Sequence, residues 1–260
     1  MLIMDRMDVY LRKYLLEHRQ MTWKKRIEIT FNIIYALRRI HEENVIHRDL
    51  HSGNILYLEC NDEWYISDLG FSGPAEKPLK SVYGIPPYIA PEVLAGKECT
   101  FASDVYSIGM LMWEISSGQP PFAGSDDVVD LALKILDGMR PNIVPGTPLE
   151  YKSLMKQCWD ADPSKRPDIH VLYNKIQEMI KPYVSNESSP SETNNNLEIP
   201  KVPRFEITDA SSILFTSNIY TFENVSEPKN ATEGKNYILF MFLLNKLLLI
   251  LYENIFYFQY

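Results

Sequence analysis

The stretch HRDLHSGN, residues 47–54, lies between a helical pattern and a strand pattern. Before it, Thr22 can cap a helix over about residues 24–43, in which apolar side chains recur three and four positions apart. After it, two apolar runs at 54–58 and 64–67 flank a short polar run, which predicts two short strands joined by a tight turn. We therefore expect this charged stretch to lie between a mostly buried helix and a hairpin.

The same stretch fits the pattern H-R-D-L-x-x-x-N, and on this motif the chain resembles the protein-kinase family. Phosphoryl transfer needs a carboxylate that orients the attacking hydroxyl and takes its proton, and a carboxamide that holds a metal ion. The resemblance implies that Asp49 is this base and that Asn54 is a metal ligand. The other candidates for the catalytic loop are His47, Arg48 and His51.

Asp68-Leu69-Gly70 follows Asp49 by nineteen residues and is similar to the metal-binding D-F-G of the family, with Leu in place of Phe. The resemblance implies that Asp68 binds a Mg²⁺ ion that bridges the ATP phosphates, since a hard cation prefers oxygen ligands. Leu69 keeps an apolar side chain where the family packs one, so we do not expect this change to disable the site. ATP and Mg²⁺ are the implied cofactors.

Three further motifs resemble structural features of the family: A-P-E, the run 162–167 that contains Arg166, and the run that begins at Ser103. Ala90-Pro91-Glu92 matches A-P-E, whose Glu pairs with a distant Arg, and Arg166 occupies the matching place here. The run that begins at Ser103-Asp104 resembles the buried central helix, whose Asp caps the backbone of the catalytic loop. With five motifs in this order and spacing, a chance match is negligible.

The resemblance covers about residues 2–181 and predicts a mainly α-helical fold, the large lobe of a protein kinase with a small β-hairpin at the catalytic and metal-binding loops. Asp5 and Met7 would form the edge of the ATP site, and Leu56 its floor. The sequence has no G-x-G-x-x-G loop and no V-A-I-K lysine, which enclose the phosphates in the family. We therefore expect an incomplete small lobe and no kinase activity from the 260 residues alone.

The acceptor is expected to be a protein Ser or Thr hydroxyl, with Tyr left open. His51 stands where Ser/Thr kinases usually have Lys, and an imidazole is only partly charged at neutral pH. Ile85 stands where they usually have Thr, and it cannot hydrogen-bond to Asp49. Cys158-Trp159 resembles the tyrosine-kinase-like branch, many of whose members act on Ser and Thr. The alternative is a non-catalytic binding module or a pseudokinase fragment.

Composition excludes other classes of function. The net charge of −8 and the pI near 5.2 argue against a nucleic-acid partner, because phosphate backbones attract clustered Lys and Arg. Three widely spaced cysteines indicate neither a disulfide framework nor a thiolate zinc site, so a reducing cytosol fits best. A protein substrate is the expected partner, and the sequence does not indicate an oligomeric state.

The chain is expected to divide into a kinase domain over residues 1–182, a polar and disordered tail over 183–236, and an apolar segment over 237–260. Three interpretations of the apolar segment remain: translated non-coding sequence, a membrane anchor, or a docked helix. The first is favoured because the segment is rich in Leu, Ile, Phe, Tyr, Asn and Lys, the residues that AT-rich non-coding DNA encodes when it is translated. Membrane contact is therefore expected only if this segment is an anchor.

Overall fold

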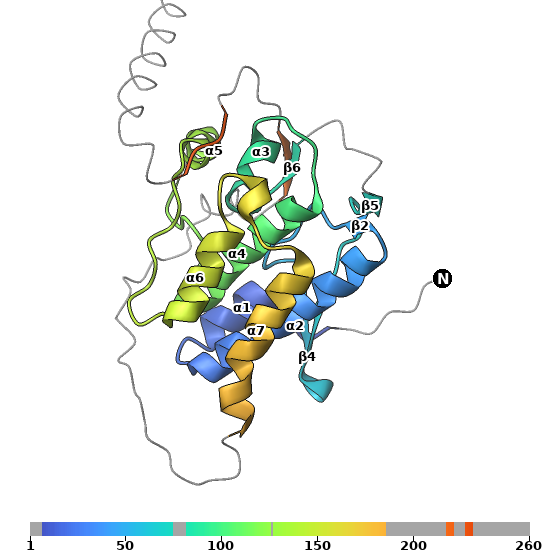
Figure 1. Cartoon of the computed structure of the whole chain (residues 1–260), viewed down its shortest axis with the longest axis vertical. Helices are drawn as coiled ribbons and strands as arrows, with labels where there is room; N and C mark the ends of the chain where they lie inside the picture. Colours follow the sequence, from blue (N-terminus) through green and yellow to red (C-terminus); the bar gives the residue numbers. More distant parts are fainter. Residues whose placement is uncertain (1–6, 75–81, 126, 186–216, 221–226, 231–260) are drawn as a thin grey trace, which may run out of the picture.

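A computed structural model describes residues 7–74, 82–125, 127–185, 217–220 and 227–230, and Figure 1 shows a mainly helical arrangement with a few short strands. The α-helices are α1 (Leu11–Glu17), α2 (Trp23–Glu42), α3 (Pro91–Leu94), α4 (Phe101–Ser117), α5 (Val128–Leu136), α6 (Leu149–Cys158) and α7 (Ile169–Ser185). Short 3₁₀ turns are η1 (Glu59–Asn61), η2 (Pro86–Tyr88) and η3 (Pro163–Lys165). The strands are β1 (Val9–Tyr10), β2 (Val45–Ile46), β3 (Ile55–Leu58), β4 (Glu63–Ile66), β5 (Gly73–Pro74), β6 (Val82–Gly84) and β7 (Asn218–Tyr220).

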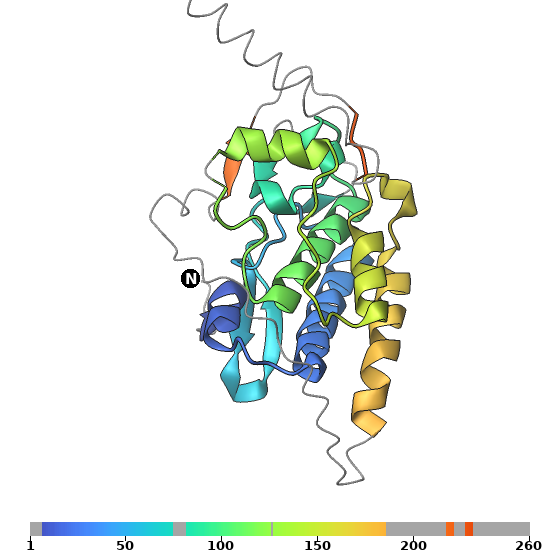
Figure 2. The same cartoon turned by 90° about the vertical axis from the view of Figure 1, so that its left-hand side faces the viewer.

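The core forms around α4, which packs against α2 on one side and α6 on the other, while α7 packs along α2 (Figure 2). Tyr106 of α4 and Tyr151 of α6 are fully buried, as are the apolar stripes of α2. Each fully buried large apolar side chain contributes about 1.5–3 kcal/mol relative to exposure. The core is therefore helix on helix, in agreement with the mainly α-helical fold that the resemblance predicts.

Residues of the types that favour helix termini lie at both the starts and the ends of these helices. Thr22 Oγ accepts a hydrogen bond from Lys25 N at 3.3 Å at the start of α2, which confirms the predicted cap. The Asp127 carboxylate accepts from the backbone amides of Val129 and Asp130 at the start of α5, at 2.9 and 3.0 Å. After α4 the chain turns at Gly118, whose φ of 70° suits glycine.

Three small antiparallel sheets accompany the helices: β1-β3-β4, β2-β5 and β6-β7. The predicted hairpin is present as β3 and β4, paired from Ile55↔Ile66 to Leu58↔Glu63. The first sheet also contains β1, because Tyr10 pairs with Leu56. This third strand holds the chain before α1 against the hairpin that leads into the candidate site.

Of the segments expected after the domain, only the polar tail is described in part. α7 runs to Ser185, and two short stretches, 217–220 and 227–230, lie against the domain. The apolar segment 237–260 and the candidate ATP-site residue Asp5 lie outside the described residues. Within the part of the chain that the structure describes, no helix is both long and apolar enough to cross a membrane.

Candidate active site

Asp104, in the first turn of α4, holds the backbone of the loop 47–54. This residue is 1% exposed, and its carboxylate accepts hydrogen bonds from His47 N at 2.8 Å and Arg48 N at 2.9 Å. It also lies 2.9 Å from Nε2 of His41. Arg48 has a φ of 72°, a left-handed conformation that costs energy for a non-glycine residue. The predicted cap is therefore present, and it stabilises a strained turn directly before Asp49.

Asp49 is 4% exposed and is surrounded by residues of its own loop. Its amide donates to His47 Nδ1 at 3.3 Å, which leaves His47 Nε2 as the ring nitrogen that donates to Ser67 O at 3.0 Å. Asn54 Nδ2 donates to Asp49 O at 2.9 Å and to Oδ2 at 3.3 Å. These contacts fix the orientation of the carboxylate.

The expected metal ligands Asn54 and Asp68 are placed at the two ends of the hairpin β3-β4, Asn54 just before β3 and Asp68 two residues after β4. Asn54 O accepts from Ser67 N at 2.8 Å, so Asn54 lies beside the residue that precedes Asp68. The Asp68 carboxylate is exposed, and the amide nitrogen of Asn54 is bonded to Asp49, which leaves the Asn54 amide oxygen as a ligand atom. A carboxylate and an amide oxygen fit Mg²⁺, which completes its shell with water and phosphate oxygens.

Arg48 ties the chain that follows Asp68 to the catalytic loop. Its guanidinium donates to Phe71 O at 3.3 Å and to Pro74 O at 2.9 Å, beside the paired strands β2 and β5. The expected packing of Leu69 is wrong, because its side chain is 57% exposed. The left-handed φ of 60° at Asp68 turns the chain there, and the next side chain faces solvent instead of the core.

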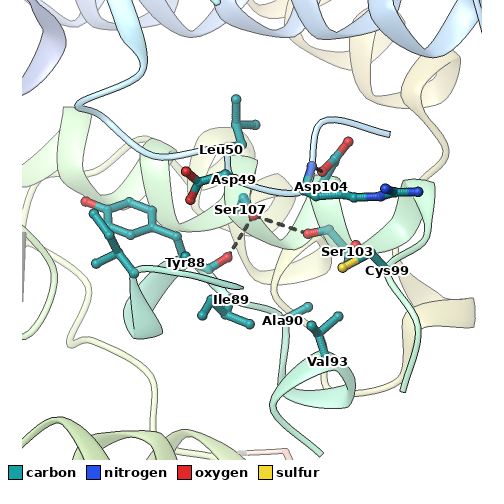
Figure 3. Close-up of a pocket in the computed structure, with 13 residues that line it drawn as sticks. Asp49, Leu50, Tyr88, Ile89, Ala90, Val93, Cys99, Ser103, Asp104 and Ser107 are labelled. Atoms are coloured by element: carbon teal, nitrogen blue, oxygen red, sulfur yellow. Dashed lines mark hydrogen bonds between the residues drawn. The ribbon is translucent and has the colours of Figure 1, made fainter. Parts of the chain in front are cut away.

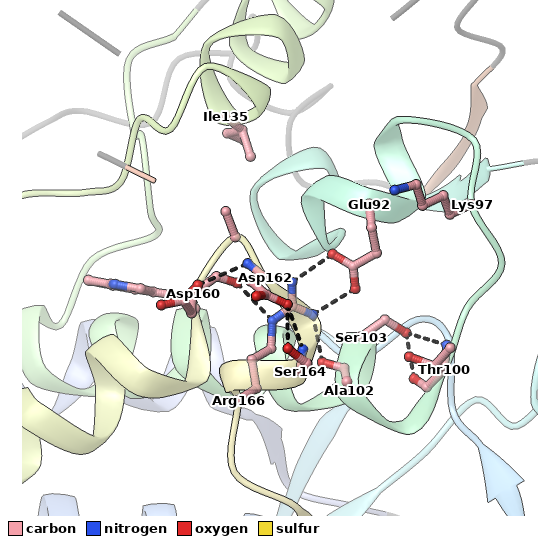
Figure 4. A network of polar contacts seen from close by, with 12 residues as sticks. Glu92, Lys97, Thr100, Ala102, Ser103, Ile135, Asp160, Asp162, Ser164 and Arg166 are labelled. Carbon is pink, nitrogen blue, oxygen red and sulfur yellow. Dashed lines mark hydrogen bonds and ion pairs between the residues drawn. The ribbon is translucent and has the colours of Figure 1, made fainter. Parts of the chain in front are cut away.

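The predicted contact between Glu92 and Arg166 is present (Figure 4). Two Arg166 nitrogens each lie 2.6 Å from a Glu92 carboxylate oxygen, and the two residues are 4% and 6% exposed. Arg166 also donates to Asp160 O and Ala102 O, both at 2.8 Å. The pair therefore joins α3 to the start of α4 and to the turn after α6.

A second buried network was missed by the sequence analysis. The Glu114 carboxylate of α4, 1% exposed, accepts from Ser52 Oγ at 2.9 Å and from the Tyr88 hydroxyl, and Arg12 Nε lies 3.5 Å away. Burial raises the pKa of Tyr88, and the neighbouring Glu114 acts in the same direction, so the phenol stays a donor. The available signal was a glutamate directly after the apolar run from Ile108 to Trp113 in α4.

The end of the loop 82–92 packs closely beneath Asp49. Figure 3 shows the cavity there, which is about 20 Å³ and is lined by Asp49, Tyr88 and Ser107 among others. Ser107 Oγ donates to Tyr88 O at 2.7 Å, and Ile85 is 1% exposed. A cavity of this size holds about one water molecule. The cavity is therefore too small for an acceptor side chain to reach Asp49 through it.

Asp49 also contacts Ser217, a residue that the sequence analysis missed. Its Oγ is 2.9 and 3.0 Å from the two Asp49 carboxylate oxygens and 3.1 Å from His51 Nε2. His51 itself is 3.7 Å from Asp49 and packs beside the Tyr88 ring. No motif or periodicity distinguishes Ser217 within the polar tail, so the sequence offered no signal.

The structure describes two of the three candidate ATP-site residues. Leu56 is half-buried on β3, and Met7 is half-buried just before β1. Asp5 lies outside the described residues. The structure thus brings Asp49, His47, His51 and Asn54 together, with Asp68 at the open end of the hairpin.

Comparisons with known proteins show the family of the chain. A family model described as protein tyrosine and serine/threonine kinase matches residues 1–176. A dual serine/threonine and tyrosine protein kinase of Canis lupus familiaris is 32% identical over 60% of this chain and 17% of its own length. A dual specificity protein kinase of Dictyostelium discoideum is 30% identical over 66% of this chain and 24% of its own. The chain thus spans less than a quarter of these relatives, and it belongs to the protein tyrosine and serine/threonine kinase family.

Proposed function

We propose that this chain forms the catalytic lobe of a protein kinase that transfers the γ-phosphoryl group of ATP to a protein hydroxyl. The observation that carries the proposal is the orientation of Asp49, whose carboxylate is held by Asn54 while its loop is capped by Asp104. A catalytic base must be held within hydrogen-bonding reach of the proton it removes. The buried contacts around Asp49 supply that rigidity.

Each residue of the site has a role in this reaction. Asp49 orients the acceptor hydroxyl and receives its proton as the oxygen attacks phosphorus. Asn54 and Asp68 would hold Mg²⁺, which neutralises charge on the phosphate oxygens when it is bound. His51, 3.7 Å from Asp49, replaces the lysine of Ser/Thr kinases and helps to position the acceptor oxygen.

The lobe assignment and the ATP site belong to the same proposal. β1 and the hairpin β3-β4 form an edge with Met7 and Leu56 where an adenine would bind, and the helices form the large lobe below. Such a surface encloses ATP only when a glycine-rich loop and a lysine cover the phosphates. We therefore expect measurable transfer only when a kinase small lobe precedes this chain.

Ser and Thr are the proposed acceptors, and Tyr remains open. The dual names of the relatives support both classes of hydroxyl for those proteins. A cytosolic location is also proposed, because Cys60, Cys99 and Cys158 are all free thiols. The non-catalytic alternative shares the same fold and differs only in whether Asp49 is used.

The test compares the chain, preceded by a kinase small lobe, with its Asp49→Asn variant in a radiolabel transfer assay on a generic protein substrate. Asp49→Asn should lower kcat by about 10²–10⁴-fold, while affinity for Mg-ATP stays within a few-fold, because Asp49 faces the acceptor hydroxyl. Asp130→Asn, which removes an exposed ion pair with Lys134 on α5, is the control and should leave kcat unchanged.

Two results would contradict the proposal. Equal transfer by the Asp49→Asn and parent proteins would remove the role given to Asp49. Absence of transfer by the parent, in a protein that melts cooperatively and binds Mg-ATP, would favour the non-catalytic alternative.

A further inference from the structure

The strand β7 is paired with the end of the loop that borders the catalytic base. β6 and β7 are antiparallel, with Val82↔Tyr220, Tyr83↔Ile219 and Gly84↔Asn218 as partners. Gly84 lies against Asp49, because a Cβ added there would be 3.2 Å from Asp49 Oδ1. Ser217, which precedes Asn218 in the chain, therefore lies beside Asp49.

The hydrogen bonds of Ser217 direct its proton to Asp49. His51 Nδ1 accepts from Gly53 N at 3.0 Å, which leaves Nε2 as the ring nitrogen that carries a proton. That Nε2–H can donate to Ser217 Oγ, 3.1 Å away. The serine hydroxyl then donates to the Asp49 carboxylate at 2.9 to 3.0 Å, which is the geometry a general base requires of an acceptor hydroxyl.

The tail is held at a second place, ten residues after Ser217. Lys229 N donates to Leu136 O at the end of α5 at 2.8 Å, and Lys97 Nζ lies 2.7 Å from the Glu227 carboxylate. Asn230 Oδ1 accepts from Ala161 N at 2.8 Å, and its Nδ2 donates to Asp160 at 3.0 Å. Figure 2 shows the two tail segments at opposite ends of α5. Contacts at both places favour docking of the tail on its own domain.

We propose that Ser217 is a phosphoacceptor of this chain's own active site, delivered in cis by the pairing of β7 with β6; the inference rests on the kinase function proposed above. In the transfer step, Ser217 Oγ forms a bond to the γ-phosphorus of ATP. The bond from that phosphorus to the β–γ bridging oxygen breaks, and ADP leaves with the electron pair. The Ser217 proton passes to the Asp49 carboxylate.

Attachment to the same chain explains why so short a strand can occupy the site. A three-residue strand makes few contacts, but a tethered ligand has an effective concentration that can reach the millimolar range. While Ser217 occupies the space above Asp49, an external protein substrate cannot place its hydroxyl there. After transfer, the phosphate on Ser217 carries negative charge beside Asp49, which disfavours the docked position.

The first experiment maps phosphate on the full chain preceded by a kinase small lobe, incubated with Mg-ATP and analysed by mass spectrometry. We expect phosphate on Ser217 at a rate per molecule that is unchanged over a hundred-fold dilution, because the reaction is intramolecular. Asp49→Asn and Ser217→Ala should each abolish this signal. Ser226→Ala, in the same tail, is the matched control and should not change it.

A second measurement, amide hydrogen exchange in the absence of nucleotide, tests whether β7 docks on β6. In the 260-residue chain, the paired change Asn218→Pro with Ile219→Pro removes two backbone donors from β7 and should speed amide hydrogen exchange at residues 82–84. The same change should lower Ser217 phosphorylation by at least about tenfold, because the effective concentration is lost. Unchanged exchange at 82–84 would show that β7 does not dock there.

The outcomes separate the two proposals. If an added protein substrate is phosphorylated while Ser217 is not, the inference is wrong and the kinase function stands. If neither is phosphorylated, both fail. Phosphorylation of Ser217 at a rate that falls in proportion to dilution would overturn delivery in cis, since the tail of one molecule would then be serving another.

Discussion

Arg166 and Glu92 form a bidentate ion pair, with both nitrogen–oxygen distances at 2.6 Å and both side chains almost fully buried. Removing one partner of a buried pair leaves the other charge without compensation. Arg166→Ala should therefore lower the free energy of unfolding by about 3–5 kcal/mol, measured by urea denaturation. The loss should exceed that of any exposed ion pair in the chain.

The matched control for this prediction is the exposed pair between Lys134 and Asp130 on α5, 2.5 Å apart. Lys134→Ala should change the free energy of unfolding by less than about 1 kcal/mol, because water screens the pair. An Arg166→Ala protein as stable as the Lys134→Ala protein would show that the buried pair does not hold α3 to the core.

Asp104 stabilises the catalytic loop by accepting from two consecutive amides. Asp104→Asn keeps one carbonyl acceptor but places an NH₂ group against an amide N–H, which leaves a buried donor unsatisfied at a cost of about 1–3 kcal/mol. We expect faster hydrogen exchange at the amides of His47 and Arg48 than in the parent protein. Exchange that is unchanged at these two amides would mean that the loop holds its strained turn without Asp104.

Gly109 lets α4 and α6 approach closely, which reverses the usual effect of a glycine-to-alanine change. In an exposed helix, alanine is favoured over glycine by about 1 kcal/mol. Here an added Cβ would lie 2.9 Å from Cys158 Cβ and 3.1 Å from Trp159 N. Gly109→Ala should therefore destabilise the protein by about 1–3 kcal/mol, measured as a lower urea midpoint at an unchanged slope. A higher midpoint would show that the two helices can move apart without loss.

Much of the fold followed from patterns within the sequence. The helical period of residues 24–43, the cap at Thr22 and the two apolar runs around the turn predicted α2 and the hairpin, because each of these signals is local. The contacts of Asp104, and of Glu92 with Arg166, followed from the family resemblance. Such contacts join residues more than fifty positions apart, which periodicity alone cannot relate.

The missed features depend on tertiary packing. Glu114 could be recognised as a buried charge within an apolar helix, but nothing in the sequence names Ser52, Tyr88 and Arg12 as its partners. Leu69 was expected to pack because of its type, whereas the turn at Asp68 exposes it. The docking of Ser217 depends on a three-residue strand whose pairing is set by the register with β6, and so short a segment carries no periodic signal.

The three cysteines should differ in their reactivity toward iodoacetamide. Burial raises the pKa of the Cys99 thiol to about 11 and that of Cys158 to about 12, so at pH 8 less than about one thiol in a hundred is the reactive thiolate at either position. Cys60 is exposed on η1. Because a thiol must be both accessible and deprotonated to react, Cys60 should be modified first in the native protein. The half-buried Cys99 should follow slowly, and the buried Cys158 should react only at the rate of unfolding. Peptide mapping at intervals, with and without urea, measures this order, and a Cys60→Ser variant shows whether any native labelling remains. Rapid native labelling of Cys158 would mean that α4 and α6 separate far more often than the packing at Gly109 allows.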